Sequence, residues 1–359
     1  MSWKSSLGIN VVFLAAFSVA ALVAGATPSN PPDSLGTVSA TLYTCPTNHA
    51  LPSGTCYQLD VSCPLVQDYT VDVKIIAPPP PAVEIGMVMF LTGGLSDLFV
   101  EKASQGPTII NGLLAQNIGT VEVAFPGSGW QSNTNGAGVR AASCRFATVA
   151  QWAYTNVLPS GAALCACGNS AGSQQIGEGL SHFALGEYLT VGLMTSGPPF
   201  ERVDWACMNN QKGQAEYCSG QKIGYGVSPG ASIPFIDPAY LPTQAACSSA
   251  FSSHKSPLAA QFLNDSITSP DGELSYPTTQ TIFLFGGKDT SSAINQGLSY
   301  TNLISPTPAP IVACAADSPH DVFNDPGAAT MIVSFLTQYC YLPPSGASST
   351  GKPGGKRQP

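Results

Sequence analysis

The sequence predicts an α/β fold in which a mainly parallel β-sheet is covered by helices on both faces. Short apolar runs alternate with segments of helical periodicity along most of the 359 residues, as in a chain built from repeated strand–helix units. Most of these runs are continuously apolar, as expected of strands buried on both faces. The length is sufficient for one large domain or two ordinary ones, each with a sizeable core.

Seven runs have the length and composition of strands. They are "YTVDVKIIA" (69–77), "IGMVMFL" (85–91), "TVEVAF" (120–125), "ALCAC" (163–167), "LTVGLMT" (189–195), "TIFLFG" (281–286) and "PIVACAA" (310–316). Helices are expected at 97–117, 140–156, 171–185, 291–303 and 326–340. A hairpin around "CPTNHALPSGTC" precedes the first run, and we expect Cys45 and Cys56 to close it with a disulfide.

The amino-terminal stretch predicts secretion. Lys4 precedes "LGINVVFLAAFSVAALVAG", which ends in the small-residue cleavage pattern Ala24-Gly25-Ala26. A membrane anchor is the alternative, since the stretch is nearly long enough to span a bilayer, but the short basic flank and terminal position favour a signal peptide at 1–26. We therefore expect an extracellular protein without a membrane anchor, whose folded domain covers 27–342. The Pro/Gly/Ser-rich residues 343–359 are expected to form a disordered tail.

Composition excludes some partners. Charged residues make up only 9% of the chain and the formal net charge is −8, so nucleic acid and anionic membranes are not expected partners. All 11 cysteines follow the predicted cleavage point, and disulfides persist outside the cell. The odd count leaves at least one thiol without an intramolecular partner. We interpret Cys165 and Cys167 as small buried hydrophobic residues on one face of a strand, because zinc would require a Cys/His cluster that is absent from the sequence.

Residues 200–277 interrupt the alternation of strands and helices. The segment is rich in Pro, Gly and Ser and carries three cysteines, and irregular stretches of this length are usually functional or form a subdomain. We interpret it as a cap-like insertion over the carboxyl edge of the sheet. Within it we expect a disulfide between Cys207 and Cys218, and Asn264 begins the N-x-S/T sequon of the mature chain, a glycosylation candidate.

Ser170 is the candidate nucleophile. Gly168-Asn169-Ser170-Ala171-Gly172 follows an apolar strand and precedes a helix, the context in which G-x-S-x-G forms a nucleophile elbow. The alternative is that this serine only fills a turn. A serine hydroxyl is a poor nucleophile and needs a base with a partner that orients it.

His320 is the candidate base and Asp289 its partner. His320 lies in "CAADSPHDVFNDPGAA" after the last apolar run, and Asp289 follows the preceding run in "IFLFGGKDT"; an acid there can hold the imidazole tautomer. Of the other histidines after Ser170, His182 falls within a helix and His254 within the insertion. Asp317 is the alternative acid. Asp325 is expected to cap the final helix, with Pro326 at its first position.

An oxyanion hole is expected beside the serine. "VMFLTGGLSD" places two glycines directly after an apolar run, so the backbone N–H of Gly94 or Leu95 could join that of Ala171 at one carbonyl oxygen. A plain turn is the alternative. Trp130 in "FPGSGWQ" follows the next run and is a candidate to line the substrate pocket; the alternative is a partly buried aromatic residue of the loop.

Over residues 69–341 these elements resemble the α/β-hydrolase superfamily. The resemblance is carried by TGGL, GNSAG, the turn at Asp289 and the loop of His320, in that order. It implies a mainly parallel eight-stranded sheet, a serine triad and a variable cap, here 200–277.

The sequence thus predicts a secreted serine hydrolase that cleaves small-molecule or polymeric carboxylic esters through an acyl-enzyme. This chemistry requires no cofactor and no metal. A secreted serine peptidase on the same fold is the nearest alternative, and a catalytically silent binding or surface protein is the second.

Overall fold

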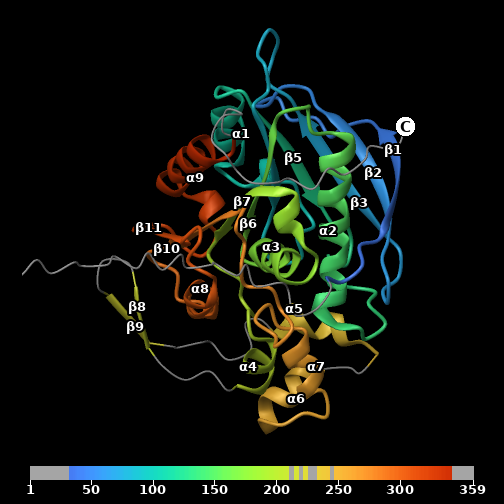
Figure 1. The fold of residues 1–359 in the computed structure, drawn as a ribbon, viewed down its shortest axis with the longest axis vertical. Helices are drawn as coiled ribbons and strands as arrows, with labels where there is room; N and C mark the ends of the chain where they lie inside the picture. Colours follow the sequence, from blue (N-terminus) through green and yellow to red (C-terminus); the bar gives the residue numbers. More distant parts are fainter. Residues whose placement is uncertain (1–31, 210–213, 218–220, 225–232, 243–245, 342–359) are drawn as a thin grey trace, which may run out of the picture. The chain divides into compact units, whose positions relative to one another are not determined.

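A single large sheet organises the described part of the chain (Figure 1). The computed structural model describes residues 32–209, 214–217, 221–224, 233–242 and 246–341, so the predicted signal peptide and tail lie outside it. The strands of this sheet are β1 (Thr37–Tyr43), β2 (Thr55–Ser62), β3 (Tyr69–Ile76), β4 (Gly86–Leu91), β5 (Ile118–Ala124), β6 (Ala163–Asn169), β7 (Leu189–Thr195), β10 (Gln280–Gly286) and β11 (Ile311–Ala315). All seven predicted runs and the predicted hairpin are present.

The sheet has the order β1-β2-β3-β5-β4-β6-β7-β10-β11. The six strands from β5 to β11 in this order are parallel, and β1, β2 and β3 join them by antiparallel pairing. The sheet therefore has nine strands and not the eight that the resemblance implies, because the amino-terminal hairpin supplies two strands in addition to the seven runs.

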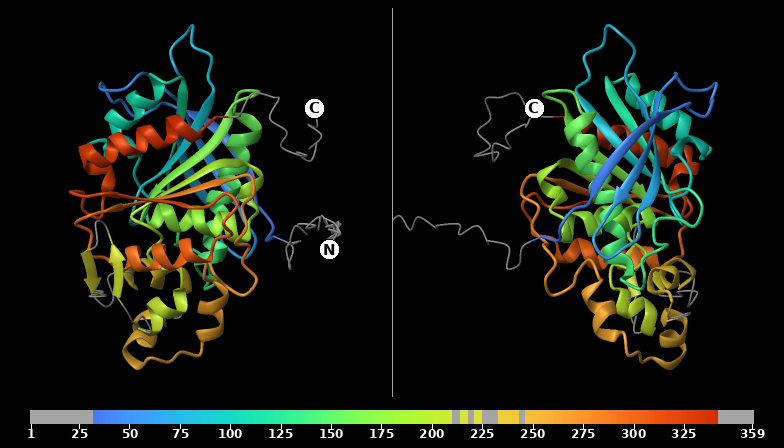
Figure 2. Two further views of the ribbon diagram at one scale, coloured as in Figure 1. Left: turned by 60° about the vertical axis from the view of Figure 1, so that its left-hand side comes forward. Right: turned by 90° about the vertical axis from the view of Figure 1, so that its right-hand side faces the viewer.

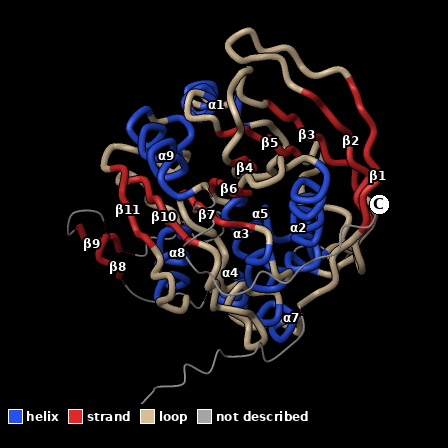
Figure 3. The backbone as a smooth tube through the Cα atoms, turned by 45° about the horizontal axis from the view of Figure 1, so that its top comes forward, coloured by secondary structure: helices blue, strands red, loops and turns tan. Residues whose placement is uncertain are grey.

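Helices cover both faces of the sheet (Figures 2 and 3). Because side chains alternate along a strand, Met87, Met89 and Leu91 of β4 pack into one apolar cluster, and Val88 and Phe90 into another. The first cluster includes helices α2 (Gly138–Asn156), α3 (Ala171–His182) and α8 (Ser292–Leu303), and the second includes α1 (Gly106–Leu114) and α9 (Pro326–Tyr339). Among the described residues, no helix has both the length and the apolar character needed to cross a membrane.

One predicted helix begins later than expected. The segment 97–117 contains a short 3₁₀ turn, η1 (Val100–Lys102), and the α-helix starts only at Gly106. The chain turns back on itself there, since a Cβ on Gly106 would lie 1.9 Å from the Val100 carbonyl oxygen. At the other end of the chain, Asp325 caps α9 by accepting a hydrogen bond from Ala328 N at 2.7 Å, as predicted.

Four disulfides connect described cysteines. The predicted Cys45–Cys56 bond is present, together with Cys63–Cys144, Cys165–Cys340 and Cys207–Cys247. The prediction of Cys207–Cys218 is wrong, because the helices that carry Cys207 and Cys247 pack together and bring their Cα atoms within 4.6 Å; Cys218 lies outside the described residues. Cys165 is correspondingly a disulfide cysteine, whereas Cys167 is a buried free thiol.

The described residues of the insertion form short helices and one two-stranded hairpin. It contains α4 (Val203–Met208), the hairpin β8 (Gln214–Tyr217) and β9 (Gln221–Gly224), α5 (Ile233–Ile236), η3 (Asp237–Tyr240), α6 (Ala246–Ser253) and α7 (Ala259–Asn264). Asn264, the predicted glycosylation candidate, is exposed at the end of α7.

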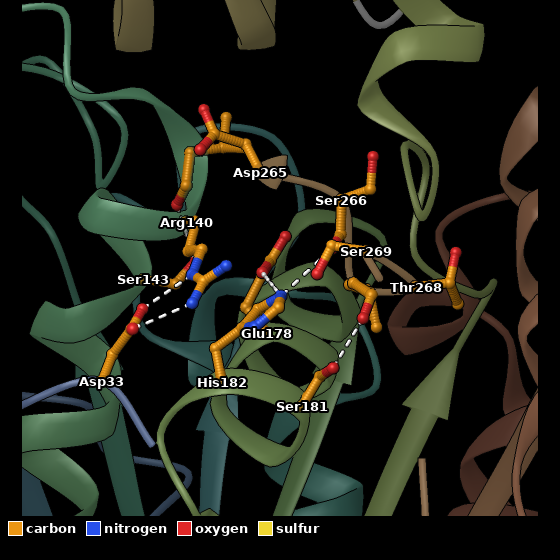
Figure 4. Close-up of polar contacts among 12 residues, drawn as sticks. Asp33, Arg140, Ser143, Glu178, Ser181, His182, Asp265, Ser266, Thr268 and Ser269 are labelled. Carbon is orange, nitrogen blue, oxygen red and sulfur yellow. Dashed lines mark hydrogen bonds and ion pairs between the residues drawn. The ribbon is translucent and has the colours of Figure 1, made fainter. Parts of the chain in front are cut away.

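A partly buried polar network attaches the end of the insertion to α2 and α3 (Figure 4). On α2, the Arg140 guanidinium donates to Asp33 at 2.7 Å and to Asp271 at 2.9 Å. On α3, His182 Nε2 lies 3.0 Å from the Ser266 carbonyl oxygen, and Ser181 donates to the Ile267 carbonyl oxygen at 2.5 Å. Segments far apart in the sequence are therefore fixed against α2 and α3, the latter being the helix that follows Ser170.

Several carboxyl groups are largely removed from solvent. Burial raises the pKa of Glu122 to about 8, although its Oε2 accepts a hydrogen bond from Glu101 N at 2.8 Å. Burial likewise raises the pKa to about 7 at each of three other carboxyl groups, Glu84, Glu201 and Asp265. Burial lowers the pKa of His182 to about 4. The folded chain thus keeps these groups uncharged over much of the acidic range.

We expect stability to fall as the pH rises from about 5 to about 8. A carboxyl group with a raised pKa binds more protons in the folded state, so the free energy of unfolding decreases through this range. His182 acts in the opposite direction between about pH 4 and 6.5, but it is one group against four. Thermal unfolding across this range measures the effect, and Glu122→Gln should reduce the fall while the exposed Glu187→Gln should not. A melting temperature as high at pH 8 as at pH 5 would contradict the expectation.

Candidate active site

A pocket of about 490 Å³ lies at the carboxyl ends of the parallel strands, where ligands bind in sheets of this kind. The segments that line it follow β4, β6, β7, β10 and β11 in turn. Ser170 and His320 both line this pocket, as do Gly94 and Ala171. Four of the residues singled out from sequence thus share one cavity.

Ser170 occupies a sharp bend between β6 and α3. Its φ of 51° and ψ of −107° lie outside the regions that an L-residue normally adopts, and such strain persists only where the surroundings impose it. Ser170 N donates to the Thr195 carbonyl oxygen at 2.9 Å, and Gln174 N donates to the Ser170 carbonyl oxygen at 2.9 Å. These contacts fix Ser170 as the N-cap residue, immediately before α3.

The two glycines of the G-x-S-x-G sequence are required by close backbone contact. A Cβ on Gly168 would lie 2.4 Å from the Gly172 carbonyl carbon, and a Cβ on Gly172 would lie 2.6 Å from the Leu91 carbonyl oxygen. Neither backbone atom can move away easily, so any larger residue would push the strand and the helix apart. Ser173 and Thr195 reinforce the bend, because both hydroxyls donate to the Gly168 carbonyl oxygen.

His320 and Asp289 are hydrogen-bonded. The ring Nδ1 lies 2.7 Å from Asp289 Oδ2, and the carboxylate is almost completely buried, with its side chain 1% exposed, whereas that of His320 is 38% exposed. The second carboxylate oxygen accepts from Ser291 N at 2.7 Å. The imidazole can therefore keep its proton on Nδ1 and offer Nε2 as a base.

The loop of His320 is held by its backbone as well. Ser196, which follows β7 and is fully buried, donates its hydroxyl to the His320 carbonyl oxygen. Its own N–H donates to the Leu284 carbonyl oxygen at 2.8 Å. Sequence analysis did not identify Ser196, since a serine after an apolar run is common in turns.

The alternative acid and bases lie elsewhere. Asp317 forms an exposed ion pair with Lys288 at 3.0 Å. His182 is buried in the polar network described above, and the exposed His254 has its Nδ1 3.0 Å from the Met208 carbonyl oxygen. None of these residues lines the pocket.

The loop after β4 lies directly beside Ser170. A Cβ on Gly93 would be 3.5 Å from Ser170 Cβ, and Gly94 adopts a left-handed conformation with φ of 60°. The loop is tied to α3, since Gln175 Nε2 donates to Ser96 Oγ at 3.0 Å. Gly94 and Ala171 line the pocket, but Leu95 does not, so only one of the two predicted loop donors faces the cavity.

Three aromatic residues, Phe99, Phe200 and Phe235, line the pocket. Phe200 follows β7, and Phe235 comes from α5 of the insertion, with its ring 3.6 Å from the place a Cβ would take on Gly94. The prediction that Trp130 lines the pocket is wrong. Trp130 is fully buried and stacks on Phe200 at 6.5 Å between ring centroids, so it supports this wall from behind.

Among the hydrogen bonds of the described residues, none joins the Ser170 hydroxyl to the His320 ring. Such contacts are often long in the absence of substrate and tighten when it binds. What the pocket holds is a strained serine at a helix amino terminus, a histidine polarised by a buried carboxylate, and adjoining glycine backbone.

Comparison with solved structures agrees with this architecture. A protein from Agrobacterium vitis S4 superposes with a TM-score of 0.50 at 10% identity, covering 85% of this chain and 99% of its own. The chain has the α/β-hydrolase fold.

Other proteins of the α/β-hydrolase fold align less closely. A Pyrococcus furiosus esterase, Pf2001, has a TM-score of 0.45 at 14% identity, covering 87% of this chain and 100% of its own. Est1E from Butyrivibrio proteoclasticus has a TM-score of 0.44 at 8% identity, covering 77% and 96%. No protein-family model matches the sequence. No curated protein matches it either.

Proposed function

We propose that this chain is a secreted serine hydrolase that cleaves carboxylic esters through an acyl-enzyme intermediate. The observation that carries the proposal is the 2.7 Å contact between His320 and the buried Asp289 in the same pocket as the strained Ser170. If Ser170 only filled a turn, nothing would require it to share a cavity with a histidine that is hydrogen-bonded to a buried carboxylate.

In the proposed mechanism, Ser170 Oγ attacks the ester carbonyl carbon as His320 Nε2 takes its proton. The carbonyl oxygen becomes an oxyanion, which Ala171 N and Gly94 N stabilise together with the amino-terminal end of α3. His320 then gives the proton to the leaving alcohol, and Ser170 remains acylated. Water repeats the sequence, with His320 as its base, and releases the acid.

Neutral esters are the proposed substrates. Phe200, Phe235, Leu98 and Pro199 give the pocket an apolar wall, and apolar walls bind uncharged acyl or aryl groups. Of the charged residues that line it, Lys102 is opposed by Asp97 and Asp321. The site therefore has no excess positive charge with which to hold a phosphate or a peptide carboxylate.

Replacing the proposed triad tests this function. Ser170→Ala and His320→Ala should each lower kcat for an ester by about 10⁴-fold, and Asp289→Asn should lower it by about 10³- to 10⁴-fold because the imidazole takes the wrong tautomer. Circular dichroism checks that each variant is folded.

Asp317→Asn is the matched control, since this acid is exposed and away from the pocket. Asp317→Asn should keep the parent activity. Loss of activity in this variant with full activity in Asp289→Asn would show that the acid is misassigned. An organophosphonate that fails to label Ser170 in the parent would favour the catalytically silent binding protein.

Esters should be cleaved much faster than matching amides. An amide needs its leaving nitrogen to be protonated and held, and the apolar wall offers few groups for that purpose. We expect kcat/KM on an aryl or short acyl ester to exceed that on the matching peptide amide by at least about 10²-fold. Comparable values on the two substrates would favour the serine peptidase.

Secretion is tested on exported protein. Four disulfides among described residues are compatible with an oxidising compartment. Amino-terminal sequencing should begin at or near Thr27, and in a eukaryotic host glycosidase treatment should lower the mass through the glycan on Asn264. A retained Met1 would contradict the signal peptide, and an unchanged mass would contradict the glycosylation.

A further inference from the structure

Ser291 contacts the ring of His320 directly. Its hydroxyl lies 3.0 Å from Nδ1, and Nδ1 is also 2.7 Å from Asp289 Oδ2. At the same time Ser291 N donates to Asp289 Oδ1 at 2.7 Å. One residue therefore contacts both partners of the His–Asp pair, through its backbone and through its side chain.

The position of Ser291 makes this contact unexpected. It is the N-cap residue of α8, where a serine side chain normally accepts a hydrogen bond from the first turn of its own helix. Ser291 makes no such bond, whereas Asp325 does so at the start of α9. The hydroxyl is thus directed toward the imidazole instead of capping its helix, and Ser291 also lines the pocket.

We propose that Ser291 is a positioning residue of the proposed hydrolase, one that holds the His320 ring and stabilises its protonated form during catalysis. This inference rests on the proposed function. Ser291 does not touch the reacting atoms, and it acts through His320 and Asp289.

The geometry gives the hydroxyl two effects. When His320 takes the proton from Ser170, the ring becomes a cation and its Nδ1–H has two acceptors, Asp289 Oδ2 and Ser291 Oγ, which favour the charged form. Two acceptors on one edge also oppose rotation of the ring, so that Nε2 stays directed away from them. The Ser196 contact to the His320 carbonyl oxygen fixes the backbone of the same residue.

Other charged groups near the ring stay constant in the test. Asp289 contacts Nδ1, Asp321 adjoins His320 in the chain, and Asp97 and Lys102 line the same pocket. Burial raises the pKa of Asp321, opposed by its interaction with His320. Changing Ser291 alone leaves all four in place.

The experiment measures ester hydrolysis against pH for the parent, Ser291→Ala and Ser291→Thr. In Ser291→Ala we expect the plateau of kcat to fall by about 5-fold with KM little changed, since substrate contacts remain. The midpoint of the acid limb should move down by about half a pH unit, because the protonated ring loses an acceptor. Ser291→Thr keeps the hydroxyl and should restore the parent midpoint.

Asp325→Ala is the control for a purely structural role, because it removes a genuine helix cap. It should lower the melting temperature without moving the acid limb. The inference is overturned if the midpoint in Ser291→Ala equals that of the parent, whatever the rate, or if Ser291→Thr behaves as Ser291→Ala does.

A second measurement does not depend on activity. The ring protons of His320 can be followed by NMR during a pH titration and assigned by their loss in His320→Ala. The titration midpoint should be lower in Ser291→Ala than in the parent. Equal midpoints overturn only the role of Ser291. A parent protein that hydrolyses no ester overturns the proposed function, so the two failures are distinguishable.

Discussion

The close backbone contact between β6, α3 and the end of β4 is the constraint on which the candidate site depends. Gly168, Gly172 and Leu91 approach so closely that neither glycine could carry a Cβ. This contact forces Ser170 into a conformation that an isolated chain would avoid. It also brings the Gly93–Gly94 loop alongside the serine, so that the proposed nucleophile and the proposed oxyanion donors are placed by one packing event.

The proposed base is placed by a separate set of contacts. Asp289 and His320 follow adjacent parallel strands, β10 and β11, whose carboxyl ends meet at the same edge of the sheet. Ser196, after β7, holds the His320 backbone, and Ser291 contacts the ring. Three neighbouring strand ends therefore cooperate to fix one residue.

Much of this arrangement could be predicted from the sequence because it depends on local rules. Apolar runs mark the buried strands, and residues that follow such runs, among them Ser170, Asp289 and His320, must lie at one edge of a parallel sheet. What could not be predicted depends on how separate elements pack. The partner of Cys207 is decided by the contact between α4 and α6, and the place of Trp130 by its stacking on Phe200. Ser291 shows a third case, since the local rule for a serine before a helix predicts a cap and the structure turns its hydroxyl to His320 instead.

Helix α3 connects the candidate site to the insertion. Ser170 is its N-cap residue, and its turns carry a series of buried polar side chains that begins at the pocket wall. Phe200 N donates to Gln174 Oε1 at 3.3 Å, and Gln174 Nε2 donates to Glu178 Oε1 at 2.9 Å. Glu178 lies 3.4 Å from His182, which contacts Ser266 of the insertion.

Burial raises the pKa of Glu178 well above its ordinary value and lowers that of His182. His182 is therefore uncharged near neutral pH, and burial favours the uncharged form of Glu178, which reduces the desolvation penalty of this continuous polar path. The same helix thus fixes the strained serine at one end and anchors the insertion, which supplies Phe235 to the pocket, at the other. Substitutions along this path would alter the shape of the pocket without touching any residue of the proposed triad.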